Sequence, residues 1–168
     1  PTTVFEDKML NSMLFADSCI GKVVDSLRSS EEWDNTLVII VADHAYLYPY
    51  GISASAVERH RIPMLWLGGA LKGAKCVDSY CSQSDLAATL LSQMGIAHDD
   101  FALSRDIFAP ESYKFGYYTF NNGFGVVDDS GSTIYDCTTE SVTNSGTEVQ
   151  ELIGKTMLQS TYNIIKQL

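Results

Sequence analysis

Residues Asn35–His44 read Asn-Thr-Leu-Val-Ile-Ile-Val-Ala-Asp-His, and the prediction of the fold starts from them. An apolar run rich in β-branched residues follows a polar start, which is typical of a buried central strand in a mostly parallel α/β sheet. The run ends abruptly at Asp43 and His44. Ligand sites of open α/β sheets lie at the carboxyl ends of strands, where packing holds the side chains in position. We therefore expect the functional site at Asp43 and His44.

The side chains of Asp43 and His44 suit a metal ion. A carboxylate and a neutral imidazole, adjacent where the chain leaves the strand, can both turn toward one divalent cation. A catalytic metal takes three or more protein ligands, so at least one further ligand has to come from elsewhere. The alternative is structural, with Asp43 capping a turn and His44 forming a hydrogen bond in a cleft. The pair by itself does not decide between these two interpretations.

Three later stretches of the chain carry further family-like motifs besides the one that ends at Asp43 and His44. They read Arg-Ile-Pro-Met-Leu-Trp-Leu-Gly-Gly at 61–69, Ser-Gln-Ser-Asp-Leu-Ala-Ala-Thr-Leu-Leu-Ser-Gln-Met-Gly-Ile at 82–96 and Tyr-Thr-Phe-Asn-Asn-Gly-Phe-Gly at 118–125. Together with residues 34–44, and in this order, they resemble the sulfatase-like branch of the alkaline phosphatase superfamily. The resemblance is closest to the lipoteichoic acid synthase-like membrane phosphoglycerol transferases, and it covers nearly the whole chain.

This resemblance implies that residues 1–168 are the carboxyl-terminal half of a sulfatase-like catalytic domain. The expected fold is an α/β alkaline phosphatase-like partial sheet with flanking helices over 1–110, then a small antiparallel β-sheet and a carboxyl-terminal helix over 111–168. Family members use a Thr, Ser or modified Cys nucleophile and an acidic metal ligand near the start of the domain. Both are expected upstream, so no residue here is assigned as catalytic and the isolated chain is expected to be inactive.

The function implied by the resemblance is that of a metal-dependent transferase or hydrolase of phosphate or sulfate esters. Phosphoglycerol transfer in cell-envelope polymer metabolism is the first expectation, and sulfate ester hydrolysis by a sulfatase is the second. A noncatalytic domain of the same fold that binds an envelope polymer stays open, because Ala45 stands where many relatives have Gly. A generic doubly wound binding domain is a further alternative.

The resemblance also implies a cofactor and partners. We expect one divalent metal ion, held in part by Asp43 and His44. Oxygen-rich ligation favours Mn²⁺, while Mg²⁺, Ca²⁺ and Zn²⁺ remain alternatives. The expected partners are a substrate derived from a phospholipid or an envelope polymer and the upstream half of the same catalytic domain. The intact protein is expected to have membrane helices upstream and to display this domain on the extracytoplasmic face of a bacterial membrane, in the periplasm or at the cell surface.

Three residues outside the metal pair are candidates for substrate binding. Arg61 could hold the nonbridging oxygens of a phosphate or sulfate ester with its guanidinium fork, and His60 could do so when protonated. Tyr46 begins an aromatic loop after the metal pair, and its hydroxyl and ring suit a sugar or glycerol phosphate. The structural alternatives are solvated charges at His60 and Arg61 and loop packing by Tyr46.

Periodicity predicts the remaining elements. Apolar residues recurring at three and four predict amphipathic, core-facing helices over about 4–29, 82–94 and 148–168. Ser82 or Ser84 is the expected cap of the second helix, whose core side includes Met94 and which ends at Gly95; Asp85 is expected in its first turn and not at the metal. The Asn121-Asn122-Gly123 turn predicts a hairpin of strands 115–120 and 124–128, and a strand at 132–137 follows.

Composition sets further limits. The 168 residues are 45% hydrophobic and carry a net charge of −10, which favours a folded domain and disfavours binding to nucleic acid. No apolar run approaches the roughly 20 residues that a membrane helix needs. The four cysteines fit no zinc-binding spacing. Cys19 is expected to be buried in the first helix, and Cys76 and Cys81 could form a local disulfide.

Overall fold

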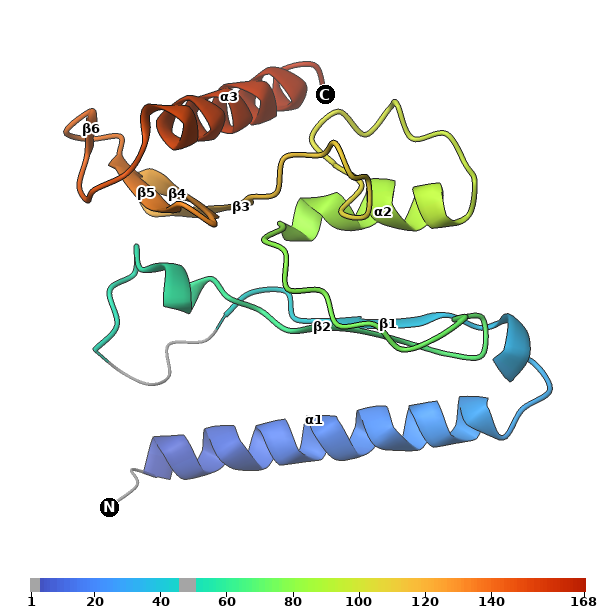
Figure 1. Ribbon diagram of the computed structural model, residues 1–168. Coiled ribbons are helices and arrows are strands. Elements are labelled where there is room, and N and C mark those ends of the chain that lie inside the picture. The colour runs from blue at the N-terminus through green and yellow to red at the C-terminus, as the bar shows by residue number, and fades with distance from the viewer. Residues whose placement is uncertain (1–3, 46–50) are drawn as a thin grey trace. The chain divides into compact units, whose positions relative to one another are not determined.

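The computed structural model describes residues 4–45 and 51–168 (Figure 1). The chain forms two compact units. Unit 1 comprises Pro1–Ala42 and Pro63–Cys76, and unit 2 comprises Asp43–Ile62 and Val77–Leu168. The mixture of helices with partial sheets agrees with the predicted fold class. Within the described ranges, no helix has the length and apolar content needed to cross a membrane.

Unit 1 contains one long helix and a pair of strands. Helix α1 spans Val4–Arg28, in agreement with the prediction. Strands β1, Val38–Val41, and β2, Met64–Leu67, pair antiparallel, with Val38 opposite Leu67. In the described part of the chain β1 thus has an antiparallel neighbour, where a mostly parallel sheet was predicted. The apolar run indicates that a strand is buried but carries no information about the direction of the strand beside it.

Two glycines after β2 allow it to lie close to the residues before β1. Gly68 has a φ of +133°, and a Cβ there would lie 2.1 Å from the backbone oxygen of Thr36. A Cβ at Gly69 would lie 2.6 Å from the Cα of Asp34. The backbone N–H of Gly69 also donates to the oxygen of Trp33 at 3.1 Å. The predicted turn after β2 therefore depends on both residues lacking a side chain.

The predicted core role of α1 is not observed within unit 1. Phe5 and Met13 are 58% and 59% exposed, and no described residue of unit 1 is buried. Two strands of four residues each offer too little apolar surface to cover a helix of 25 residues. Cys19 on the same helix is half-buried, not fully buried as predicted. No disulfide joins Cys76 to Cys81 in the described chain.

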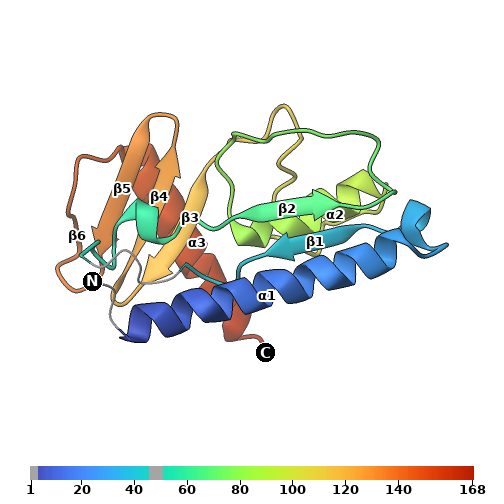
Figure 2. The same ribbon diagram turned by 90° about the horizontal axis from the view of Figure 1, so that it is seen from below.

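Unit 2 contains an antiparallel sheet and two helices (Figure 2). The sheet has the strand order β3-β4-β5-β6. Its strands are β3 (Gly116–Phe120), β4 (Gly123–Asp128), β5 (Gly131–Asp136) and β6 (Ser141–Val142). The helices are α2 (Leu86–Gln93) and α3 (Glu148–Ile165). The predicted hairpin, third strand and two helices are confirmed, whereas β6 is too short to have produced a periodic signal.

The start and end of α2 follow the predicted signals. A 3-10 turn, Gln83–Asp85, leads into the helix, and Ser82 and Asp85 form a reciprocal capping box at the start of this turn. Gly95 has a φ of +69° after the helix, as expected of a terminating glycine. Met94 was predicted to face the core, but it is 62% exposed because the helix ends before it.

Of the Asn122-Gly123 pair in the predicted turn between β3 and β4, Asn122 has a positive φ and Gly123 does not. Asn122 has a φ of +62°, and Gly123 is already paired in β4 opposite Phe120. A Cβ at Gly123 would lie 2.4 Å from the Phe120 ring. Asparagine tolerates the left-handed region, so the turn uses Asn122 for its backbone angle and Gly123 for the space that a ring needs.

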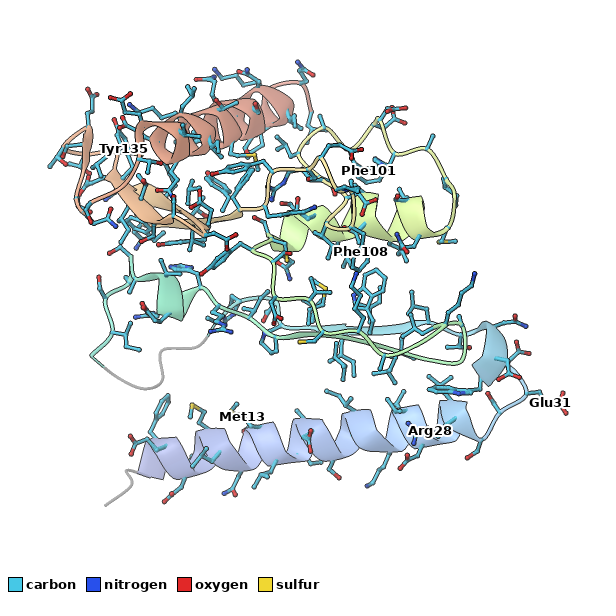
Figure 3. All side chains as sticks on the ribbon, in the orientation of Figure 1. Met13, Arg28, Glu31, Phe101, Phe108 and Tyr135 are labelled. Atoms are coloured by element: carbon cyan, nitrogen blue, oxygen red, sulfur yellow. The ribbon has the colours of Figure 1, made fainter. Side chains whose placement is uncertain are left out.

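The core of unit 2 lies between the sheet and α3. Phe124 and Tyr135 are buried and stack with ring centroids 5.0 Å apart. Tyr135, labelled in Figure 3, also lies beneath the Nζ of Lys155, 4.6 Å from the ring centre. Gly154 brings α3 onto this layer, because a Cβ there would lie 2.0 Å from the Phe124 ring. Several apolar residues of α3 that the periodicity had assigned to the core are instead exposed: Val149, Leu152, Tyr162 and Ile165.

A buried polar network fastens α3 to the sheet. Gln150 is 1% exposed, and its amide nitrogen donates to Oδ1 of Asp128 at 2.8 Å. Its amide oxygen accepts from the hydroxyl of Thr133 at 2.8 Å. Asp128 also accepts from the hydroxyl of Tyr113 at 2.5 Å and from the hydroxyl of Ser130 at 2.6 Å. The network joins β4, β5 and α3, and each of these side chains has a hydrogen-bond partner.

The Asp128 network predicts a loss of stability in acid. Burial alone would raise the pKa of Asp128, but hydrogen bonds from Ser130, Tyr113 and Gln150 together lower it below its usual value. A carboxylate with a lowered folded-state pKa stabilises the fold above its unfolded pKa of about 4, and this contribution is lost as the pH falls through the folded-state pKa. We therefore expect urea midpoints of the chain to fall below about pH 4.

The matched variant is Asp128→Asn. Loss of charged hydrogen bonds should lower its unfolding free energy at pH 7 by about 1–3 kcal/mol and flatten its stability profile in acid. Some acid sensitivity should remain, because the pKa of Asp136 is also lowered, by the backbone N–H groups of Thr138 and Thr139. Equal slopes in urea titrations of the native chain and the variant between pH 7 and pH 3 would show that Asp128 is not the responsible group.

Candidate functional site

Asp43 and His44 follow β1 and lie side by side in solvent. The side chains of Asp43 and His44 are 89% and 75% exposed, with 3.5 Å between Oδ2 of Asp43 and Nε2 of His44. The backbone N–H of His44 donates to the other carboxylate oxygen, Oδ1, at 2.9 Å. The two side chains therefore neither point apart nor lie beneath apolar packing.

The hydrogen bond of the His44 ring identifies the nitrogen that could bind a cation. Nδ1 of His44 lies 2.8 Å from the backbone oxygen of Ala45. A carbonyl oxygen only accepts, so Nδ1 carries the proton, and in the neutral ring Nε2 keeps its lone pair. Nε2 is also the nitrogen nearest to the Asp43 carboxylate. Metal-binding histidines are commonly oriented in this way by a backbone carbonyl on the opposite ring nitrogen.

Ala45 fits the backbone at this position. Among the described non-glycine residues, positive φ angles occur at Asn122 and Glu140. Ala45 is therefore outside the left-handed region, where a Cβ would be strained. The Cβ of Ala45 therefore imposes no backbone strain on the Asp43 and His44 pair.

The candidate substrate-binding residues differ in their surroundings. Nε2 of His60 lies 2.9 Å from the backbone oxygen of Ala54, and its ring stacks on Tyr118 with centroids 4.1 Å apart and planes at 15°. His60 is half-buried, whereas Arg61 beside it is exposed. Tyr46 lies outside the described residues. The roles of all three in substrate binding stay predictions.

Comparison with known protein families shows the family of the chain that carries Asp43 and His44. A family model named Sulfatase matches residues 6–96, which is more than half of the chain. The chain belongs to the sulfatase family.

The fold of this sulfatase-family chain has a counterpart among solved structures. The crystal structure of a protein in the alkaline phosphatase superfamily from Vibrio parahaemolyticus is similar to it, with a TM-score of 0.66 and 20% sequence identity. The likeness covers 89% of this chain and 40% of that chain, so this chain spans less than half of its length. It shows the alkaline phosphatase superfamily fold, as predicted. No curated protein matches the sequence.

Members of this superfamily act on phosphate or sulfate esters and typically depend on divalent metal ions. The geometry of Asp43 and His44 in the sulfatase-family chain is compatible with such an ion. The 3.5 Å between Oδ2 and Nε2 allows both atoms to approach one divalent cation from the same side. The described residues contain no group of three or more His, Cys, Asp or Glu that could hold a metal, so the pair supplies only part of a site.

Asp85 of the sulfatase-family chain belongs to a structural cluster and not to a metal site. It is 1% exposed, and its oxygens accept from the backbone N–H of Ser82 at 2.8 Å and from the backbone N–H of Arg105 at 3.0 Å. The Arg105 guanidinium donates to both carboxylate oxygens and to the backbone oxygens of Tyr113 and Phe115. These bonds occupy the carboxylate on both oxygens. The prediction that Asp85 serves the helix start is confirmed, and Arg105 is its unpredicted partner.

Proposed function

We propose that this chain is the carboxyl-terminal part of a metal-dependent catalytic domain that transfers or hydrolyses phosphate or sulfate esters. Phosphoglycerol transfer in cell-envelope polymer metabolism is the specific reaction we favour. The observation that carries the proposal is the solvent-open pair of Asp43 and His44, with the lone-pair nitrogen of His44 facing the Asp43 carboxylate. Membership of the sulfatase family supports the general chemistry.

In this proposal Oδ2 of Asp43 and Nε2 of His44 are two ligands of the ion, which we take to be Mn²⁺. When bound, such an ion neutralises charge that builds up on the transferred group and promotes ionisation of a hydroxyl nucleophile. The carbonyl of Ala45 accepts from Nδ1 and so orients the His44 ring with Nε2 toward the ion. Arg61, exposed and permanently charged, binds the nonbridging oxygens of the ester.

The proposal requires the remainder of the catalytic domain. The nucleophile and at least one further ligand would come from a segment upstream of this chain, as would any membrane helices. The exposed apolar side chains along one face of α1, such as Phe5, Met13 and Ile20, support such a partner, because an apolar stripe of this size is normally covered. The substrate would come from a phospholipid or an envelope polymer on the extracytoplasmic face of a bacterial membrane.

The test is turnover by this chain joined to its upstream half in the presence of Mn²⁺. We expect release of diacylglycerol from phosphatidylglycerol, with a kcat/KM at least about tenfold above that for an aryl sulfate, since charge and shape of the ester distinguish the two substrates by about 1.4 kcal/mol or more. The 168-residue chain alone should be inactive. Faster turnover of the sulfate would favour a sulfatase instead, and no turnover of either ester by the joined halves would contradict the enzymatic proposal.

A further inference from the structure

Tyr118 on β3 lies against a strand position that only glycine could fill. It pairs with Gly125 across the β3–β4 hairpin. A Cβ at Gly125 would lie 2.1 Å from Cζ of Tyr118, so the ring occupies the space that a side chain at 125 would take. This packing resembles the covering of a glycine by an aromatic ring on the neighbouring strand. It fixes the direction in which the Tyr118 side chain extends from the sheet.

The ring and hydroxyl of Tyr118 reach a segment far away in sequence. The hydroxyl donates to the backbone oxygen of Ser55 at 2.8 Å. The ring face stacks on His60 at 4.1 Å between centroids. Burial, followed by the nearby Glu58, raises the pKa of Tyr118 to about 12, so its hydroxyl stays a neutral donor at ordinary pH. One side chain of the carboxyl-terminal hairpin thus holds two points of the segment 51–62.

That segment also holds itself in shape. Nε2 of His60 lies 2.9 Å from the backbone oxygen of Ala54, and Nη1 of Arg59 donates to the backbone oxygen of Ile52 at 3.3 Å. The described segment 51–62 includes Arg61 and has one short regular element, the 3-10 turn Val57–Arg59. The rest of the segment therefore depends on such contacts to hold its residues in one place.

The hydrogen bonds separate the roles of His60 and Arg61. Because the Ala54 oxygen only accepts, Nε2 of His60 is the donor of this contact and is not available to an anion. The ring face toward Tyr118 is also occupied. Arg61 is exposed, and its guanidinium presents a fork of N–H donors that suits a phosphate or sulfate. Arg61 is therefore the anion contact, and His60 is part of its support.

We propose that Tyr118 is a positioning residue for ester binding: through Ser55 and His60 it holds segment 51–62 so that Arg61 meets the nonbridging oxygens of a phosphate or sulfate ester. This inference rests on the proposed function, because it takes the ligand to be an anionic ester. It assigns the carboxyl-terminal hairpin a part in substrate binding.

The probe is inorganic phosphate added to the isotopically labelled chain, followed by the NMR shift of the Arg61 Nε–H. Tyr118→Leu removes the ring and the hydroxyl, and it should weaken phosphate binding about tenfold or more. Tyr118→Phe removes only the bond to Ser55 and should weaken it about fivefold or less, since one hydrogen bond contributes about 1 kcal/mol. Gly125→Ala places a methyl group where the Tyr118 ring lies and changes no residue of segment 51–62. It should therefore displace the ring and weaken phosphate binding as Tyr118→Leu does.

Thr119→Ala is the control, because Thr119 is the exposed neighbour of Tyr118 on the same strand. Partial rescue by Phe, with recovery of the ring-current shift of His60, separates positioning from a general loss of stability. Native-like phosphate binding in both Tyr118→Phe and Gly125→Ala would overturn the inference, as would the lack of any phosphate shift at Arg61 in the native chain. Failure of the proposed function is seen separately, as the lack of turnover by the joined halves.

Discussion

Replacing Asp85 with Ala is expected to unfold much of unit 2 near physiological temperature. The change leaves the Arg105 guanidinium half-buried without its carboxylate, and removing one partner of a buried ion pair costs about 3–5 kcal/mol. Whole domains are stable by only about 5–15 kcal/mol. Thermal unfolding followed by circular dichroism should therefore show a Tm lowered by about 10–20 °C.

The comparison variants decide whether the ion pair causes this loss. Asp99→Ala removes an exposed carboxylate from the following loop and should leave the Tm within about 2 °C of the native value. The double variant Asp85→Ala/Arg105→Met removes both charges and should be more stable than Asp85→Ala alone, because no buried charge is left unpaired. A native Tm for Asp85→Ala would mean that the pair does not hold α2 to the loop before β3.

The second large effect is expected at Asp43 and His44, where substitutions should weaken metal binding and leave the stability of the fold unchanged. In the joined halves, Asp43→Asn and His44→Gln should each weaken Mn²⁺ binding at least about 100-fold, because loss of an outer-shell partner alone costs 10–100-fold. Both side chains are mostly exposed, so the Tm should change by no more than about 2 °C. Calorimetric titration with Mn²⁺ and thermal unfolding on the same samples measure the two quantities.

The matched control for this pair is Asp99→Asn, another exposed carboxylate of unit 2. It changes the same charge on the same unit and should bind Mn²⁺ as the native protein does. Loss of affinity in all three variants would indicate a general effect of negative charge. Native affinity in Asp43→Asn and His44→Gln would mean that the ligands lie elsewhere.

Sequence patterns located most of the helices and strands because those signals are local. The amphipathic period gave α1 and α3, and the Asn-Asn-Gly turn gave the β3–β4 hairpin. The antiparallel pairing of β1 with β2 has no local signal, since strand burial does not specify the direction of a neighbour. The periodic stripes also overestimated the core, because whether a helix face is covered depends on what packs against it.

At the candidate site, too, local features could be predicted from the sequence and long-range contacts could not. An acid and a histidine at the end of an apolar run were visible in sequence, and the structure adds the distance between them and the protonated nitrogen of His44. The pairing of Asp85 with Arg105 joins residues 20 positions apart with no motif between them. The contact of Tyr118 with Ser55 spans 63 positions. Such contacts are determined by tertiary packing and could not be read from spacing.

The most direct test of the account is Mn²⁺ titration of the labelled native chain, followed by paramagnetic broadening of its NMR signals. Even a weakly bound Mn²⁺ broadens the signals of nuclei close to it, so an incomplete ligand set is sufficient for this measurement. The account predicts that the signals of Asp43, His44 and Ala45 broaden first and that Asp43→Asn abolishes this effect. Broadening that begins at other acidic residues, and leaves His44 sharp, would contradict it.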